Sequence, residues 1–518
     1  MRDKWGRWIY TSYREGEVIR IVFLFQAASV WASWESVYEA CMADSNVEVK
    51  MLLLTQHGVE KAQMISAREF LVRKRIPYEV FEAFDLESYL PHIAFVQFPY
   101  DLSYHAPDAL SLRLKEKGIR IAYIPYGIEI SDEKNARRDH FENFVVENSR
   151  WIFTCCEAVR EEYWKYCRNR EAVRVCGSPK FDGLAHKEDY PLTQDFKRKA
   201  NGRRIILWKM HFPKKISADG TVRQITPDLD EYIRFAKELD KYRDLFFIVM
   251  PHPKMLYGMV ESDIKGDISL KNKADELLYI IQTKDNAAVD SSDDYRNSLY
   301  HADVIIMDRS AVMIEAAMTG KPVLLMRNSE YQEKWTNGVR QVADAFVQGS
   351  RAEDMEQFLE AVRMENCLEQ KKAEKALEQF FPYHGGLCGW QIKELIKREL
   401  AQEADGEETG KKLKIVLYGA GEVCGYYLEE GFAKAGWSEE ICEVVALIDG
   451  NSLKWSIETY GYKIKSTEIL REIDFDVIVI MTEQNYFEIK KELVYALFID
   501  ERRIWRLDEF LCKLSEDL

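Results

Sequence analysis

The residues on either side of His252 are expected to hold its imidazole ring in a fixed orientation. It follows the apolar run Leu245–Met250 and stands between Pro251 and Pro253. Proline fixes φ and has no backbone donor, so this loop is expected to be stiff. A stiff imidazole that donates a hydrogen bond suits a phosphate group. The alternative interpretation is a histidine that only caps a turn.

His211 is a second histidine at the expected end of a strand in the same part of the chain. It follows the apolar run Ile205–Trp208, after Lys209 and Met210. This position makes His211 a candidate for phosphate contact. Packing against the adjacent Phe212 is the alternative.

The residues after the apolar run Val304–Met307 predict an anion site. Ser310 is a preferred N-cap residue, and the pattern that follows predicts a helix over 311–319. Backbone amides and the helix dipole at such an N-terminus attract anions. Glu315 either accepts hydrogen bonds from ribose hydroxyls or is solvated. The residues expected at a bound phosphate are Asp308, Arg309, Ser310 and Ala311.

A glycine turn near the end of the chain indicates a nucleotide site. The apolar run Leu413–Tyr418 leads into Gly419, Gly421 and Gly425, and Asp449 ends the next apolar run. Such a turn places a pyrophosphate at a helix start, with an acid for the ribose. The glycine spacing departs from G-x-G-x-x-G by one residue, and Asp449 lies 28 residues past Gly421. A Rossmann-like module without a nucleotide is the alternative.

These residues must be positioned by strands that alternate with helices, which predicts an α/β fold with doubly wound parallel sheets. We expect one domain over 1–190 and a second over 203–400, with a hinge between them. The expected strands of the first domain are Val18–Phe25, Val47–Leu54, Ile93–Phe98, Ile119–Ile124, Trp151–Thr154 and Val173–Cys176. Those of the second are Ile205–Trp208, Leu245–Met250, Ala287–Val289, Val304–Met307 and Pro322–Met326.

A third α/β unit is expected over 412–518, after a polar linker at 401–411. This unit has 13 Lys and Arg against 21 Asp and Glu, and so carries −8 of the chain's net charge of −15. The acidic balance argues against nucleic acid as a partner. No run of 18 apolar residues, no signal-peptide core and no zinc-ligand spacing occurs. We therefore expect a cytoplasmic protein without a metal site.

A set of short motifs occurs in a characteristic order over nearly 400 residues. They are Pro99-Tyr100-Asp101, Tyr123-Ile124-Pro125-Tyr126-Gly127, Gly177-Ser178-Pro179-Lys180-Phe181-Asp182, Ile206–Phe212, Pro251-His252-Pro253, Ala302–Ser310 and Thr319–Val323. With them, residues 18–400 resemble the CDP-glycerol glycerophosphotransferase family, the teichoic acid primases and polymerases of bacteria. Residues 412–518 resemble small Rossmann-like modules that are appended to bacterial polysaccharide enzymes.

The resemblance implies a GT-B fold, in which two Rossmann-like domains face each other. It implies transfer of glycerol or ribitol phosphate from a CDP-activated donor, with CMP as the leaving group. The acceptor would be a cell-wall or capsular polymer, or a lipid-linked acceptor at the inner face of the membrane. His252 and Ser310 would hold the donor pyrophosphate, and no cofactor would be required.

One position departs from the family pattern. The resemblance leads us to expect a His-Gly pair whose histidine is the general base, whereas this chain has Tyr126-Gly127. A phenol with a pKa near 10 is a poor base at neutral pH. His211 or Asp101 would then take the proton, unless the substrate differs.

Two other functions are compatible with the sequence. One is a GT-B glycosyltransferase that uses a sugar nucleotide, and the other is a non-catalytic nucleotide-binding protein of polysaccharide assembly. The polyol, the acceptor and the oligomeric state are left open.

Overall fold

The structure is a computed structural model of the chain. It describes residues 9–55, 61–218, 221–256, 258, 260, 264–292, 294–364, 374–378, 385–408, 412–435, 437, 441–497 and 499–515. The chain forms two compact units. The larger contains Val18–Ser111 and Ile121–Leu395, and the smaller contains the segment before Val18, Leu112–Arg120 and Ile396–Leu518.

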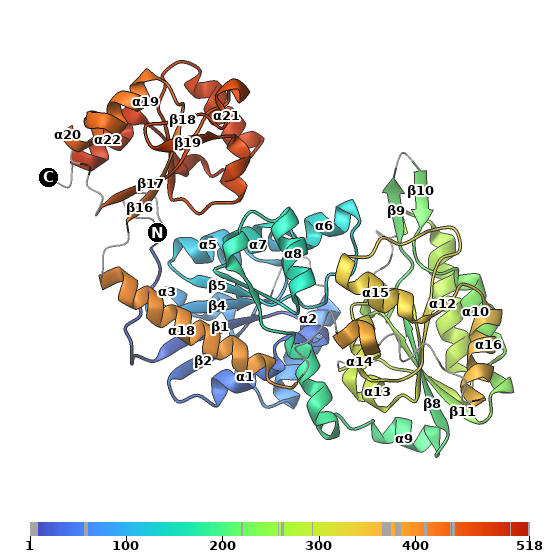
Figure 1. Cartoon of the computed structure of the whole chain (residues 1–518). Helices are drawn as coiled ribbons and strands as arrows, with labels where there is room; N and C mark the ends of the chain where they lie inside the picture. The colour runs from blue at the N-terminus through green and yellow to red at the C-terminus, as the bar shows by residue number, and fades with distance from the viewer. Residues whose placement is uncertain are drawn as a thin grey trace. The chain divides into compact units, whose positions relative to one another are not determined.

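The first half of the larger unit is built on a seven-stranded sheet of order β3-β2-β1-β4-β5-β6-β7. β1 pairs in parallel with β2 and β4. Its central strands are buried along most of their length, as in sheets covered by helices on both faces. The strands are β1 (Ile19–Phe25), β2 (Val47–Leu53), β3 (Glu79–Val80), β4 (Ile93–Val96), β5 (Arg120–Tyr123), β6 (Trp151–Thr154) and β7 (Val173–Val175). Helices that accompany them include α1 (Glu35–Met42), α2 (Lys61–Arg73) and α8 (Glu157–Tyr166) (Figure 1).

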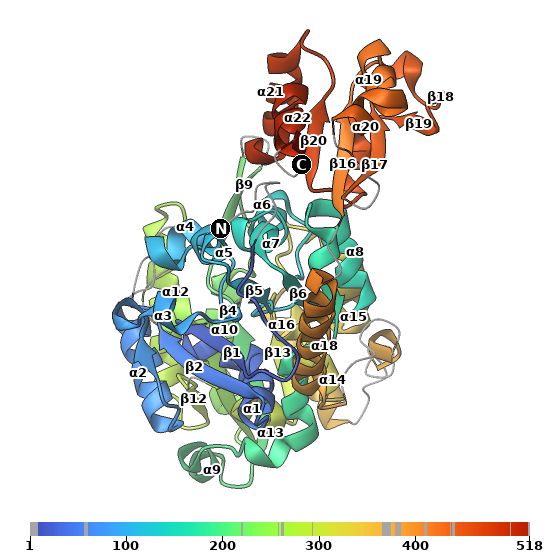
Figure 2. The ribbon, with the colours of Figure 1, turned by 90° about the vertical axis from the view of Figure 1, so that its left-hand side faces the viewer.

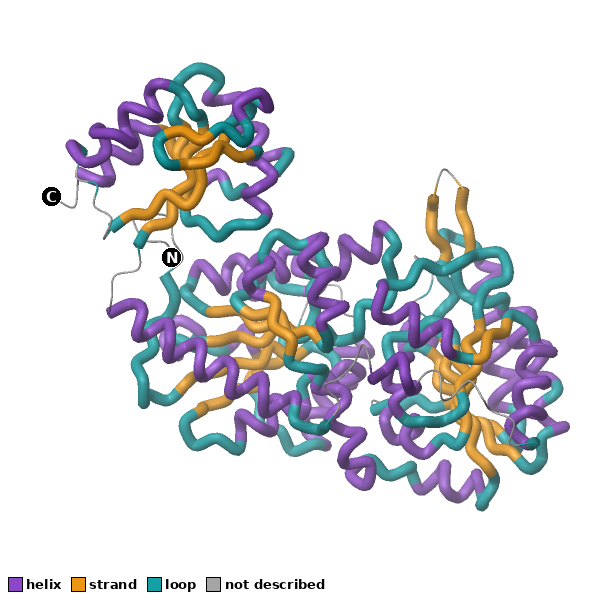
Figure 3. The backbone as a smooth tube through the Cα atoms, viewed as in Figure 1, coloured by secondary structure: helices purple, strands orange, loops and turns teal. Residues whose placement is uncertain are grey.

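The second half has a six-stranded sheet of order β12-β11-β8-β13-β14-β15. Its strands are β8 (Arg204–Met210), β11 (Leu245–Pro251), β12 (Ala287–Val289), β13 (Val304–Met307), β14 (Val323–Met326) and β15 (Val347–Gly349). Figure 3 shows the strands at the centre, with helices around them. These helices include α10 (Leu229–Lys237), α12 (Ile268–Gln282), α13 (Arg296–His301), α14 (Met313–Met318), α15 (Asn337–Ala345) and α16 (Ala352–Arg363). A separate hairpin consists of β9 (Lys215–Ala218) and β10 (Thr221–Gln224).

The smaller unit contains a third sheet, of order β18-β19-β17-β16-β20-β21. Its strands are β16 (Leu413–Tyr418), β17 (Cys442–Ile448), β18 (Glu458–Thr459), β19 (Tyr462–Lys465), β20 (Val477–Ile480) and β21 (Ile504–Arg506). Figure 2 shows the helices around these strands. They are α19 (Glu422–Tyr426), α20 (Phe432–Lys434), α21 (Tyr486–Tyr495) and α22 (Leu507–Ser515).

The predicted α/β fold class is confirmed. Apart from short extra strands, each sheet grows from a central first strand in both directions, which is the doubly wound order. The predicted strands 151–154, 287–289, 304–307 and 413–418 match observed strands at both ends. The predicted boundaries at 190 and 203 stay predictions.

The polar stretch at 401–408 is helical, although its composition predicted a linker. α18 (Cys388–Glu408) continues through it, and residues 409–411 lie outside the described part of the chain. Gln402, Glu403 and Ala404 all have high helix propensity, which explains why polar composition alone did not end the helix.

α18 begins against the first half, so the chain returns there after completing the second sheet. The backbone amides of Cys388 and Gly389 donate to the Asp182 carboxylate at 3.0 and 2.9 Å. Lys393 forms an ion pair with Asp44 at 2.9 Å. The two halves of the larger unit are thereby tied by a second connection besides residues 190–203.

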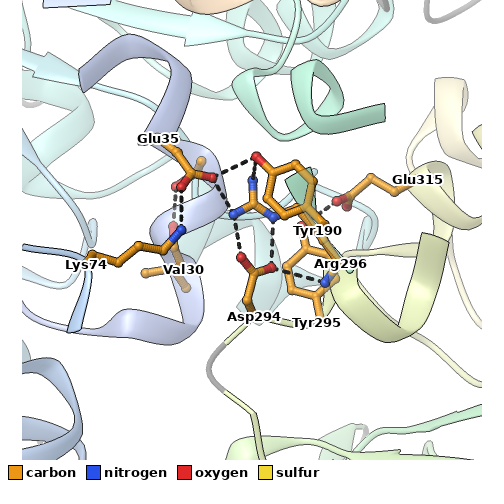
Figure 4. A network of polar contacts seen from close by, with 9 residues as sticks. Val30, Glu35, Lys74, Tyr190, Asp294, Tyr295, Arg296 and Glu315 are labelled. Atoms are coloured by element: carbon orange, nitrogen blue, oxygen red, sulfur yellow. Dashed lines mark hydrogen bonds and ion pairs between the residues drawn. The ribbon is translucent and has the colours of Figure 1, made fainter. Parts of the chain in front are cut away.

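A buried ionic network joins the two halves directly (Figure 4). Arg296 of α13 pairs with Glu35 of α1 at 2.5 Å and with Asp294 at 2.7 Å. The Tyr190 hydroxyl donates to Glu35 at 2.9 Å, and Lys74 pairs with Glu35 at the same distance. Such a network is sensitive to the loss of one partner, because the remaining charges stay buried.

The network predicts a pH-dependent contribution to stability. Burial raises the pKa of Glu35, but the charges of Arg296 and Lys74 outweigh burial and hold it at about 2, below its ordinary value of 4.5. A carboxylate with a lowered pKa stabilises the fold above its unfolded pKa, here by about 3 kcal/mol, and this contribution is lost as the pH falls toward 2.

We predict that Glu35→Gln lowers the free energy of unfolding at pH 7 and that the difference from the wild type shrinks as the pH falls below about 4.5. Denaturant unfolding of both proteins over a pH series measures this difference. A difference that stays constant from pH 7 to pH 3 would contradict the role of the ionised carboxylate.

Candidate active site

Asp308 organises the carboxyl ends of the two central strands of the second sheet. β8 and β13 are neighbours where the strand order reverses, which is the usual ligand position in such sheets. The buried Asp308 carboxylate accepts from the His211 amide at 2.7 Å and from the Tyr232 hydroxyl at 3.2 Å. Burial raises the pKa of Asp308, and the Lys209 ammonium opposes that rise. Asp308 therefore holds the loop that carries His211, and its contacts do not support a direct phosphate role.

His211 and His252 lie side by side above these strand ends. Their ring centroids are 5.2 Å apart, and Phe212 contacts both rings. Burial lowers the pKa of both imidazoles well below the ordinary value. Nearby positive charges lower these pKa values further. For His252, these charges include those of Lys209 and Lys254. Both rings are therefore neutral at pH 7.

Arg309 brings a guanidinium to the same place. Its Nε is 3.1 Å from Glu333, which orients the side chain. Its Nη1 is buried and has no hydrogen-bond partner in the part of the chain that the structure describes. A buried donor without a partner is costly unless a ligand satisfies it.

The turn after Arg309 differs from the sequence prediction. α14 begins at Met313 with Val312 at the N-cap, so the helix does not begin at 311 and Ser310 is not its N-cap. The Ser310 hydroxyl instead accepts from the Val312 amide at 3.3 Å, which makes a local turn that includes Ala311. Local side-chain bonding of this kind competes with the first helical turn.

Glu315 has a structural role that corrects both sequence interpretations. Its side chain is fully buried, forms an ion pair with Lys180 at 3.0 Å and accepts from the Tyr295 hydroxyl. Figure 4 shows Glu315 next to Tyr295 at the edge of the ionic network. It is therefore neither solvated nor open to a ribose.

Tyr126, at the expected position of the family histidine, follows β5 in the first half. Its hydroxyl lies 2.7 Å from that of Tyr100. Removal from water raises the pKa of Tyr126 to about 12, although the hydrogen bond with Tyr100 opposes the rise. A phenol with this pKa does not accept a proton at neutral pH, so its contacts favour a positioning role.

Asp101 lies in a hydrogen-bond network of its own. The buried carboxylate accepts from the Ser111 amide at 3.0 Å and from the Ser111 hydroxyl, and it pairs with His105 at 2.8 Å. All these partners belong to the first half. The structure does not bring Asp101 to His211 and His252, so its contacts do not support a role as the base.

The Tyr126 loop is fixed against the Arg309 turn of the other half. A Cβ on Gly127 would lie 2.7 Å from the Ala311 Cβ, so the Gly127 backbone lies closer to the Ala311 side chain than a side chain at residue 127 would allow. The continuing loop then pairs with the second half. The Thr336 amide donates to Ile130 O at 3.0 Å, and Ser131 and Trp335 form an antiparallel bridge.

Lys214 and His140 also belong to this site, although no motif in the sequence pointed to either residue. His140 ends α6 (Lys134–His140) in the first half. Burial lowers its pKa to about 4, and the charges of Lys214 and Arg309 contribute. The charge of Lys214, three residues after His211, contributes to lowering the pKa of four groups: His211, His252, Asp139 and Glu333. The one sequence signal was a lysine pair in a loop after a strand.

The glycine turn of the smaller unit has a compact local structure. Gly419 has φ +105°, which favours glycine. Asp449 accepts from the Ala420 amide at 2.9 Å and pairs with Lys454 at 2.8 Å. A Cβ on Gly425 would lie 2.2 Å from the Tyr460 hydroxyl. Because Asp449 is bonded to the turn itself, nucleotide binding by Gly419, Gly421, Gly425 and Asp449 stays a prediction.

Two simple patterns, a cluster of metal ligands and a membrane-spanning helix, do not occur among the described residues. Among them, no cluster of three or more His, Cys, Asp or Glu side chains is arranged to hold a metal ion. None of the described helices combines the length and apolar character needed to span a bilayer.

Solved structures with a related arrangement define the class as a GT-B-like pair of domains. MnaA of S. aureus in complex with UDP superposes with a TM-score of 0.51, at 14% identity over 74% of this chain and 97% of that chain. A Listeria monocytogenes protein assigned as a UDP-N-acetylglucosamine 2-epimerase gives 0.51 at 13% identity, with the same coverage. At these identities the likeness shows the fold alone. The wall teichoic acid polymerase TagF gives 0.48 at 12% identity over 75% of this chain and 90% of that chain, which is too low to carry an argument.

The chain belongs to the CDP-glycerol:poly(glycerophosphate) glycerophosphotransferase family, whose model matches residues 121–397, more than half of its length. It is therefore a transferase of this family. Residues 411–505 match a second model, described as C2185-like, N-terminal. No curated protein sequence matches the chain.

The contact between the two halves predicts a specific steric effect. We expect Gly127→Ala to lower the melting temperature, because overpacking costs about 1–3 kcal/mol and the added methyl group would meet Ala311. The double variant with Ala311→Gly removes the obstacle and should recover most of the loss. Thermal unfolding of the three proteins measures both effects. A single variant as stable as the wild type would show that the loops do not meet here.

Proposed function

We propose that this protein transfers glycerol or ribitol phosphate from a CDP-linked donor to a hydroxyl group of a cell-wall or capsular polymer, or of a lipid-linked acceptor at the inner face of the membrane. CMP leaves in the reaction. Family membership supports the donor class. The observation that carries the proposal is the convergence of His211, His252 and Arg309 at the switch point of the second sheet.

The second half has the groups that a diphosphate needs. His252 offers a neutral N–H donor, and Arg309 offers a buried nitrogen that has no partner among the described residues. Lys214 adds a positive charge, and the Ser310 hydroxyl lies in the adjacent turn. Phosphoryl transfer depends mostly on such positioning and charge stabilisation.

The first half would place the acceptor. Tyr126 and Tyr100 present paired hydroxyls beside the Arg309 turn, because Gly127 packs on Ala311. A hydroxyl of a polyol phosphate polymer can exchange hydrogen bonds with such a pair. The acceptor would then approach the donor phosphorus from the side opposite the second sheet.

The released nucleotide distinguishes this function from sugar transfer. A glycosyltransferase releases the nucleoside diphosphate, whereas polyol-phosphate transfer from a CDP donor releases CMP. The purified full-length protein should release CMP from CDP-glycerol or CDP-ribitol in the presence of a poly(glycerol phosphate) acceptor. UDP release from UDP-sugars, with no CMP from either CDP donor, would support the glycosyltransferase alternative and contradict the proposal.

We predict that His252→Ala lowers transfer by at least about 100-fold, because removal of one preorganised donor from a charge-stabilising site costs 10²–10³. His301→Ala is the matched control, since His301 is exposed and contacts Tyr190 O instead of this site. Circular dichroism should show both variants folded. Turnover near the wild-type rate by His252→Ala, with every CDP donor tested, would remove the phosphate role.

We predict that Tyr126→Phe lowers the rate by less than tenfold, because the loss of one hydrogen bond costs roughly 1 kcal/mol. Tyr100→Phe removes the same hydrogen bond from the other side and should behave alike. Initial rates of CMP release compare the two. A loss of several hundredfold confined to Tyr126→Phe would mean that this phenol takes part in proton transfer.

A further inference from the structure

The backbone fixes His211 and His252 in opposite tautomers. His211 Nδ1 lies 2.8 Å from the carbonyl oxygen of Phe212, which only accepts, so Nδ1 carries the hydrogen. The Lys254 amide donates to His252 Nδ1 at 3.1 Å, so that nitrogen carries a lone pair. Because both rings are neutral, the remaining nitrogens differ: His252 presents Nε2–H, and His211 presents an Nε2 lone pair.

The two Nε2 atoms therefore offer complementary chemistry at adjacent positions. The hydrogen bonds of both rings among the described residues are made through Nδ1, and both residues are only partly buried. His252 Nε2–H can donate to a phosphate oxygen, whereas the lone pair of His211 would repel one. The rings are 5.2 Å apart, so a hydroxyl bonded to His211 would stand next to a phosphate bonded to His252.

We propose that His211 Nε2 is the general base of the transfer, in place of the family histidine that Tyr126 replaces. This inference rests on the proposed function. The acceptor O–H bond breaks and its proton moves to His211 Nε2, while the oxygen forms a bond to the polyol-bearing phosphorus. The bond from that phosphorus to the bridging oxygen breaks, and CMP leaves with the electron pair. The imidazolium then returns its proton to solvent.

The groups around His211 keep its ring unprotonated at neutral pH. Burial lowers its pKa, and the positive groups that face it are His252 when protonated, Arg309 and Lys214. The hydrogen bond to Phe212 O opposes this effect only in part. At pH 7 the lone pair is therefore free. The other candidates are less suited: Tyr126 has a raised pKa, and Asp101 is bonded to Ser111 and His105.

The test compares two asparagine variants. In His211→Asn the amide can keep the hydrogen bond to Phe212 O while the Nε2 position is lost. We expect its kcat to fall at least 100-fold, within the usual range for general-base removal, and its Kd for CDP-glycerol to change less than threefold. We expect His252→Asn to raise that Kd at least tenfold. Calorimetric titration and CMP release measure the two quantities.

Chemical rescue separates a base from a structural group. Added imidazole should restore part of the turnover of His211→Ala, and the rescued rate should rise with pH as the neutral form of imidazole increases. His140→Ala is the comparison, because His140 is another neutral imidazole near Arg309 and Lys214. The proposal would be overturned by a wild-type kcat in His211→Asn or by a loss of donor affinity in that variant. Rescue of His140→Ala with this pH dependence, in place of His211→Ala, would also overturn it.

A readout without turnover distinguishes failure of this inference from failure of the proposed function. Two-bond ¹H–¹⁵N spectra of the histidine-labelled full-length protein report tautomers, with signals assigned from the variants. We expect His211 as the Nδ1–H form and His252 as the Nε2–H form. An Nε2–H form of His211 would overturn the base whatever the reaction. If both tautomers are as expected but no CDP donor gives CMP release, the result would instead contradict the proposed function.

Discussion

The site depends on the close approach of Gly127 to Ala311. Without a side chain at residue 127, the loop after β5 rests directly on the turn after β13, and the Ser131–Trp335 bridge extends the contact. This contact sets where Tyr126 stands relative to Arg309. A larger residue would separate the half that presents the paired tyrosines from the half that presents the imidazoles.

The surrounding structure supports this contact from both sides. The buried network of Glu35, Arg296 and Tyr190 joins the two halves, and the Lys180–Glu315 pair fixes α14 beneath the Arg309 turn. The Asp308 carboxylate accepts a hydrogen bond from the His211 amide and so fixes the His211 loop. Buried ion pairs contribute little net stability on average, but they penalise arrangements in which a partner is missing. Their role here is to fix the relative position of the two halves.

Much of the fold could be predicted from the sequence because buried parallel strands are continuous apolar runs. Val304–Met307 and Trp151–Thr154 are such runs. In the second sheet, the ends of β8, β11 and β13 place His211, His252 and Arg309 at one edge. The buried ion pair of Glu315 could not be predicted, because its partner Lys180 is distant in the sequence. His140 and Lys214 were missed for the same reason: their proximity depends on the contact between the two halves. Local bonding by Ser310 delayed the helix that its N-cap preference predicted.

This arrangement gives a physical reason for the tyrosine at residue 126, where the family pattern led us to expect a histidine. Under the proposed function, the Tyr126 phenol paired with Tyr100 positions the acceptor, and the proton acceptor is expected in the second half, next to the donor phosphates. The most direct test is a crystal structure of the full-length His211→Asn variant with CDP-glycerol. The account predicts the diphosphate within about 3 Å of His252 Nε2 and of the Arg309 guanidinium. A diphosphate bound away from both residues would contradict it.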